Sequence, residues 1–264
     1  MEIFLILYLA YLAADFLLQS DAMVKRKKHA SAKAYLQHGA IHYAAIAMVV
    51  AAFHPALLAR FRFQAIALAL VAAHLLIDLC MERVTAANAF RGVAGGSNVF
   101  VYLADQVLHF LTIAAAALWI AGTRPGALAG KLAAYQAYRE KILVVLVVYF
   151  GVVFAAGHLI RFLTKPLTRH LPSTGEETTQ RLRNAGMYIG WLERSIVLTA
   201  LLLRSPATVG LVLAAKSIAR FPELGKSELF AEYFLIGTLL SLLAAIFGGI
   251  LLLKLLTGTI QIAQ

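Results

Sequence analysis

Residues 142–156 read ILVVLVVYFGVVFAA and residues 235–253 read LIGTLLSLLAAIFGGILLL, two runs without a charged side chain. A helix needs about 20 mostly apolar residues to cross the hydrocarbon core of a bilayer, whereas a soluble protein needs a charged surface. Of the whole 264-residue chain, 61% is hydrophobic and only 14% is charged. The sequence therefore predicts an integral membrane protein built from helices.

Similar apolar runs recur along the chain and predict an all-α, polytopic transmembrane bundle of about eight spans. The seventh run is short and ends in Lys216 and Arg220, so we expect seven full spans and one short or re-entrant helix. An amphipathic segment at residues 127–138 is predicted to lie along the membrane interface. The predicted spans are Ile3–Gln19, Tyr35–Leu58, Phe63–Glu82, Val99–Ala121, Ile142–Leu163, Met187–Leu203, Thr208–Ala219 and Glu232–Leu256.

The distribution of basic residues predicts the orientation of these spans. A basic run, Lys25–Lys28, follows span one, and further basic residues lie in the loop 164–185. The positive-inside rule puts both segments in the cytoplasm and the N-terminus outside. The first span lacks a basic region before it and is predicted to be retained, not cleaved. We expect a four-span domain at 1–122, an outer loop at 123–141 and a C-terminal domain at 142–264.

The net charge of +11 does not indicate nucleic-acid binding. The Lys and Arg residues sit between apolar runs and do not form one stripe, so we expect contact with anionic membrane lipids and no nucleic acid. Cys80 is the only cysteine, which excludes an intramolecular disulfide and a CxxC metal motif. The sequence contains no P-loop, GxSxG, HExxH or dinucleotide-binding motif.

Each of the first four predicted spans carries two polar side chains spaced four residues apart, which places both on one helix face. Polar groups are costly inside a bilayer, so their positions are informative. Spans one and three carry the pair near their exit, and spans two and four near their entry. In an antiparallel bundle, all four pairs then lie at one depth in the cytoplasmic leaflet. The pairs are Asp15 and Gln19 in ADFLLQ, His38 and His42 in QHGAIH, His74 and Asp78 in HLLID, and Asp105 and His109 in DQVLH.

Imidazole and carboxylate groups gathered at one depth are typical ligands of a divalent metal ion such as Zn, Fe or Mn. The predicted metal ligands are His38, His42, His74, Asp78 and His109. Asp15 and Asp105 are candidate general bases. Gln19 and Gln106 are candidate substrate contacts. Two other interpretations stay open: a polar network that only joins helices, and a pathway for protons or ions.

A second polar group is predicted in the last three spans, near the same membrane face. It contains Glu193 and Arg194 in GWLERS, and Lys216 and Arg220 in AAKSIARF. One interpretation is a set of salt bridges between Lys216 or Arg220 and Glu193 or Glu232. The alternative is that Lys216 and Arg220 bind the anionic head group of a substrate.

Small residues recur every four positions along the predicted span eight. The stripe consists of Gly237, Ser241, Ala245 and Gly249. Small side chains let two helix backbones approach closely in a membrane. The stripe therefore predicts close helix packing, either within the chain or in a homo-oligomer formed through span eight.

The ordered series ADFLLQ, HGAIH, HLLID and DQVLH resembles the bacterial integral-membrane family known as domain of unknown function 3307, over about residues 1–120. GWLER, AAKSIARF and EYFLIGTLLS are similar to the C-terminal extension of its longer members. The resemblance implies a polytopic membrane protein of a prokaryote or a phage and brings no established activity; we expect it in the cell inner membrane. Intramembrane hydrolases of the adiponectin-receptor and alkaline-ceramidase group also use His and Asp from several spans, but in another motif order.

These patterns favour a metal-dependent membrane hydrolase that acts on a lipid or lipid-linked substrate at the cytoplasmic leaflet, with a divalent ion such as Zn as cofactor. One alternative is a transporter coupled to protons or metal ions. The outer halves of the first four spans offer mainly Tyr8, Tyr11 and Gln64, which counts against a polar path across the membrane. The other alternative is a scaffold or sensor without catalytic activity.

Overall fold

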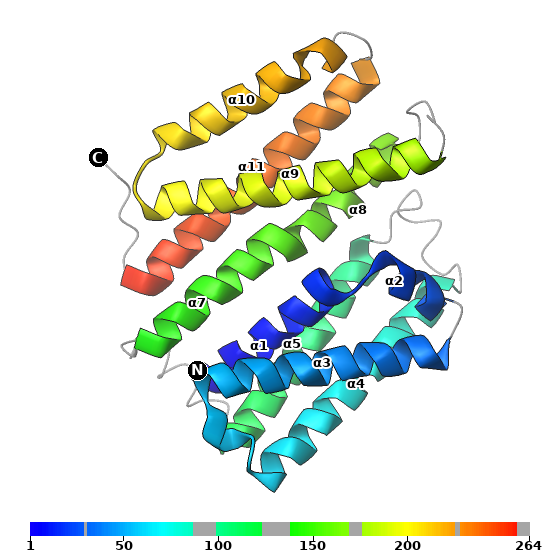
Figure 1. The fold of residues 1–264 in the computed structure, drawn as a ribbon, viewed down its shortest axis with the longest axis vertical. Helices are drawn as coiled ribbons and strands as arrows, with labels where there is room; N and C mark the ends of the chain where they lie inside the picture. The colour runs from blue at the N-terminus through cyan, green and yellow to red at the C-terminus, as the bar shows by residue number, and fades with distance from the viewer. Residues whose placement is uncertain (29–30, 87–98, 123–137, 169–175, 225–227, 258–264) are drawn as a thin grey trace. The chain divides into compact units, whose positions relative to one another are not determined.

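The computed structural model describes the chain except for residues 29–30, 87–98, 123–137, 169–175, 225–227 and 258–264 (Figure 1). The secondary structure of the described residues is entirely helical. They form two compact units, one made of the helices from α1 to α7 and the other of those from η3 to α11. The predicted all-α fold is confirmed. The predicted interfacial helix at residues 127–138 lies outside the described residues except for Tyr138, which begins α7.

The first unit is built around α1, which packs against α3, α5 and α7. A helix that is apolar on every side is stable when neighbours surround it, and Leu5, Ile6 and Leu7 are accordingly buried. Helix α4 packs between α3 and α5. The elements are α1 (Glu2–Ala13), η1 (Ala14–Leu18), α2 (Asp21–Lys28), α3 (Ala32–Phe53), η2 (Pro55–Leu57), α4 (Phe61–Ala86), α5 (Val99–Ala121) and α7 (Tyr138–Phe150).

A π-helical turn and a sharp bend follow α1. The π-helical segment η1 continues α1 to Leu18, and Gln19 then takes an extended backbone conformation that ends the helix. The next helix, α2, departs at 95° to the first. Its sequence DAMVKRKK is too polar to continue as a membrane span. The bend therefore leads a strongly basic helix away from the end of α1 (Figure 1).

The second unit is organised around α11, which packs against α8 and α9. A Cβ atom added to Gly249 would lie 2.5 Å from Leu201 Cδ1, so this glycine allows α11 and α9 to approach closely. Ser241 and Ala245 of the same stripe are buried, whereas Gly237 faces open space. The stripe thus packs within the chain along most of its length. The elements are η3 (Gly151–Ala155), α8 (Ala156–Thr168), α9 (Glu176–Leu202), α10 (Ala207–Leu224) and α11 (Glu228–Thr257).

Five described helical segments are long and apolar enough to cross a membrane. They are Ala32–Phe53, Phe61–Thr85, Val99–Ala121, Tyr138–Thr164 and Leu229–Thr257. The bent pair of Glu2–Leu18 and Asp21–Lys27 makes a sixth if it is counted as one span. The protein is therefore a polytopic membrane protein. Helices α9 and α10 fall where spans six and seven were predicted but are not in this set, so the total of eight spans stays a prediction.

Candidate metal centre

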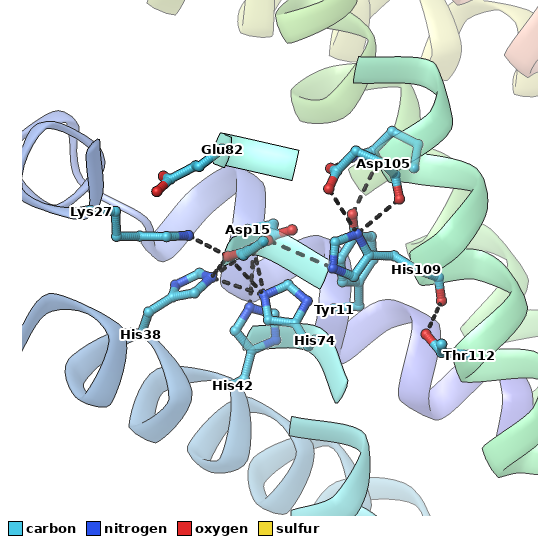
Figure 2. Close-up of polar contacts among 12 residues, drawn as sticks. Tyr11, Asp15, Lys27, His38, His42, His74, Glu82, Asp105, His109 and Thr112 are labelled. Atoms are coloured by element: carbon cyan, nitrogen blue, oxygen red, sulfur yellow. Dashed lines mark hydrogen bonds and ion pairs between the residues drawn. The ribbon is translucent and has the colours of Figure 1, made fainter. Parts of the chain in front are cut away.

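The four predicted polar pairs come from four helical elements of the first unit, and seven of their eight members lie in or directly beside one buried cluster (Figure 2). Segment η1 supplies the first carboxylate, α3 and α4 supply the central imidazoles, and α5 supplies the outermost pair. All four histidines are at most 4% exposed. The seven residues are Asp15, His38, His42, His74, Asp78, Asp105 and His109.

Local sequence features explain how these side chains meet. Asp15 lies in the π-helical turn η1, and such turns are frequent at functional sites because they shift side chains out of the α-helical register. Gly39 lies beside His38 where α3 meets α4. A Cβ atom at Gly39 would lie 3.0 Å from Leu75 Cδ1. The missing side chain therefore allows α3 and α4 to approach closely next to the histidines.

Four ligand atoms gather around one point, and we call their residues the Asp15 group: Asp15, His38, His42 and His74. Asp15 Oδ1 lies 3.0 Å from His42 Nε2, 3.2 Å from His38 Nε2 and 3.6 Å from His74 Nε2. The Nε2 atoms of His38 and His74 are 2.9 Å apart. Ligands about 2.1 Å from a tetrahedral zinc ion are about 3.4 Å from one another, so the observed separations of 2.9–3.6 Å are close to those of a metal site.

A second set of ligand atoms adjoins the first, and we call it the Asp78 group: His74, Asp78 and His109. Asp78 Oδ2 lies 3.6 Å from His74 Nε2, and Asp78 Oδ1 lies 3.7 Å from His109 Nε2. The buried Nε2 atom of His109 has no hydrogen-bond partner within the described part of the chain. An unpaired buried nitrogen is costly, so a ligand at this point would satisfy it. The two groups share His74.

The ring of His109 is held by a chain of polar contacts behind the Asp78 group. Its Nδ1 lies 2.9 Å from the carbonyl oxygen of Asp105, to which it donates, and this leaves the lone pair of Nε2 directed at the cluster. Tyr11 stacks on the ring, with the centroids 5.2 Å apart. The Tyr11 hydroxyl donates to Gln106 Oε1, and Gln106 Nε2 donates to Asp105 Oδ2. Histidines that bind metals are commonly oriented in this way.

Lys27 is a member of the cluster that the sequence analysis missed. Its Nζ forms an ion pair with Asp78 Oδ2, and its side chain is buried. The ammonium group also lies 5.6 Å from the centre of the Tyr35 ring. In the sequence, Lys27 is one of four basic residues in a row that indicate only membrane topology. The burial of this one lysine follows from the bend after η1, which no sequence pattern marked.

The predicted substrate contacts have different surroundings. Gln19 Nε2 lies 3.5 Å from the ring nitrogens of His38, at the limit of a hydrogen bond. Gln106 supports His109 through Asp105 and Tyr11, as described above. In the second unit, Lys216 donates to Glu193 Oε2 at 2.7 Å, which is one of the predicted salt bridges. The role of Lys216 and Arg220 in binding a head group stays a prediction.

Arg194 is the most buried charged side chain described in the second unit. Its Nε and Nη2 donate to the carbonyl oxygen of Val153 in η3, and its Nη1 donates to Ser241. A Cβ atom on Gly157 would lie 2.6 Å from Nη2, and one on Gly190 would lie 3.0 Å from Nη1. Two glycines thus make room for the guanidinium group, which ties α9 to η3 and α11.

A small cavity lies against the metal cluster. Its volume is about 20 Å³, which is enough for a water molecule, and its polar lining is Tyr11, His42, His74, His109 and Thr112. The rest of the lining is mostly apolar, from α1, α3, α4 and α5. The cavity therefore has room for a water molecule, but not for an acyl chain in this conformation.

Residues 3–128 match the model of the family described as "Protein of unknown function (DUF3307)". This region of the chain is therefore similar to that family. The matched residues include every member of the Asp15 and Asp78 groups, together with Lys27, Asp105 and Gln106. The resemblance found in the sequence motifs is confirmed, and the family description names no activity. No curated protein and no solved structure matches the chain.

Proposed function

We propose that this protein is a metal-dependent membrane hydrolase that acts on a lipid or lipid-linked substrate at the cytoplasmic leaflet. The observation that carries the proposal is the convergence of three imidazole Nε2 atoms on one oxygen of Asp15, at separations expected of metal ligands. Four histidines packed in an apolar bundle without an ion would place several nitrogen lone pairs against one another. A divalent cation bound among these nitrogens would explain why they lie so close together.

The composition of the cluster favours a catalytic centre over a structural one. Four protein ligands would close a zinc site at rest, so a catalytic ion in the Asp15 group would admit water as a fifth ligand during the reaction. Here Asp78 remains next to the Asp15 group, with Oδ2 3.4 Å from His38 Nε2. A divalent ion bound there would activate water and polarise a carbonyl or phosphoryl oxygen.

The geometry favours particular roles for the three carboxylates. Asp15 lies at the centre of the imidazoles and is suited to bind the ion directly. Asp78 borders both groups and is suited to accept the proton of the attacking water. Asp105 lies behind His109 and is suited to orient that ring. The general-base roles predicted for Asp15 and Asp105 are therefore less favoured than a role for Asp78.

The surroundings of the cluster support an apolar substrate. Leu7, Ile46, Val71 and Ile113 line the adjoining cavity, within helices that are apolar enough to cross the membrane. A water-soluble substrate would have to cross this lining, whereas a lipid can enter sideways from the bilayer. Since the cavity has room only for a water molecule in this conformation, substrate entry requires neighbouring helices to separate.

A transport pathway is less well supported. It would need polar groups that continue from the cluster toward the other membrane face. Instead, α1 is apolar from Ile3 to Leu7, between Glu2 and Tyr8, and the rings of Phe4, Tyr8 and Phe110 pack against one another beside this stretch. A purely structural polar network predicts that no metal is bound.

The test combines metal content with lipid hydrolysis. The detergent-purified protein is analysed by elemental mass spectrometry and incubated with vesicles of bacterial lipid extract, and products are identified by mass spectrometry. We expect a bound divalent ion and released head groups or acyl chains, both absent from the His38→Ala/His74→Ala variant. The control is His54→Ala, at the end of α3 and outside the cluster. Bound metal without turnover of any lipid would reject the hydrolase, and no bound metal would reject the centre.

A further inference from the structure

We propose that the ammonium group of Lys27 takes the place of a second metal ion beside Asp78, so that the centre binds one divalent ion, in the Asp15 group. The inference rests on the metal centre proposed above and specifies its stoichiometry. It also gives a role to a buried lysine that the hydrolytic proposal does not use.

The position of Lys27 is that of a cation within the cluster, not of a surface charge. Its Nζ contacts Asp78 Oδ2, the same oxygen that lies 3.4 Å from His38 Nε2 and 3.6 Å from His74 Nε2. Only 5% of the residue is exposed. A buried ammonium group is stable only when it is paired with an acceptor of opposite charge, and Asp78 provides that acceptor.

The shared histidine makes the two ligand groups unequal. His74 Nε2 is 3.6 Å from both Asp15 Oδ1 and Asp78 Oδ2, and one imidazole nitrogen binds a single ion. When the Asp15 group binds its ion through His74, the Asp78 group keeps Asp78 and His109. An ammonium group needs acceptor oxygens and no nitrogen lone pairs, so this reduced group suits a lysine better than a metal.

The formal charges in the cluster also favour a single divalent ion. The carboxylates of Asp15, Asp78 and Asp105, together with Lys27, leave two negative charges when the histidines are neutral. One divalent ion neutralises them. A second divalent ion would leave two positive charges among apolar helices, which is costly. Replacing Lys27 with a neutral residue removes a positive charge and reopens the oxygen of Asp78, so a second ion becomes favourable.

The experiment is a metal titration of purified protein with Mn²⁺, followed by removal of free ion and elemental analysis. We expect one ion per chain for the wild type and for Lys27→Arg, which keeps the charge. Lys27→Met should bind two ions, with the altered electron paramagnetic resonance spectrum of a coupled manganese pair. The matched control is Lys25→Met, an exposed position two residues earlier, which should bind one.

The outcomes separate this inference from the function on which it rests. One ion in both the wild type and Lys27→Met, or two ions in the wild type, overturns the inference and leaves the metal centre in place. No ion in the wild type overturns the centre itself. If Lys27→Met does not fold, Asp78→Asn decides: one retained ion supports a site in the Asp15 group, and loss of the ion overturns it.

Discussion

At the scale of single residues, His109 illustrates how the protein fixes the orientation of an imidazole beside the proposed ion. Its Nδ1 hydrogen bond to Asp105 fixes which nitrogen carries the proton, and the stacked ring of Tyr11 fixes the plane of the imidazole. Gln106 joins these two supports, because it accepts from Tyr11 and donates to Asp105. The residues behind His109 thus fix the direction of its Nε2 lone pair within the Asp78 group.

The change Gln106→Leu should weaken this support without unfolding the bundle. In the Lys27→Met background, we expect the affinity for the second ion, in the Asp78 group, to fall about tenfold, the lower end of the effect of losing a supporting hydrogen bond to a ligand. The measurement is a competition titration against a coloured chelator. Gln37→Leu, at an exposed position of α3, is the control and should leave the affinity unchanged. Equal affinities in the two variants would show that the chain of contacts does not orient His109.

At the scale of helices, hydropathy predicts where the apolar helices begin and end. It does not predict π-helical turns or bends of the backbone. The bounds of α5, Val99–Ala121, coincide with the predicted span because its ends coincide with the apolar run. Helix α9 begins at Glu176, well before the predicted Met187, because a helix can continue through polar residues that hydropathy leaves out. The four-residue spacing of the polar pairs predicts which helix faces meet. The π-helical turns and the bend before α2 leave no such pattern, so Lys27 could not be predicted.

The glycines around Arg194 give a prediction for α8 and α9. Gly157→Ala would place a methyl group 2.6 Å from Nη2 and displace the guanidinium from the carbonyl of Val153. We expect a loss of stability of about 1–3 kcal/mol, as for other overpacked sites, seen as a lower melting temperature in detergent. Gly210→Ala is the control, since nothing lies within 4 Å of its added Cβ atom. That variant should be neutral or stabilised by up to about 1 kcal/mol. Equal melting temperatures for Gly157→Ala and Gly210→Ala would show that Gly157 is not needed to make room for Arg194.

At the scale of the whole molecule, the orientation in the membrane decides from which side the centre is reached. The basic helix α2 follows the end of α1 that carries Asp15, so the positive-inside rule predicts that the centre lies in the cytoplasmic leaflet. The rule concerns charge at the membrane surface and holds independently of the fold. The orientation in the membrane therefore stays a prediction.

Cysteine labelling in intact cells tests this orientation. In a Cys80→Ser background, Lys25→Cys should react with a membrane-impermeant maleimide only after the cells are permeabilised. Arg60→Cys, in the loop between α3 and α4, should react in intact cells because it is predicted to face outward. Labelling in the opposite order would reverse the orientation and move the centre to the outer leaflet.

The central claim is that three imidazoles and a carboxylate of the Asp15 group bind one metal ion. X-ray absorption spectroscopy at the edge of the bound metal measures this directly. The account predicts about three nitrogen neighbours of imidazole type and one oxygen neighbour at about 2.0–2.2 Å when the ion is zinc. The signal should disappear in the His38→Ala/His74→Ala variant. A neighbour shell of oxygen alone, or a chain that binds no divalent ion, would contradict the account.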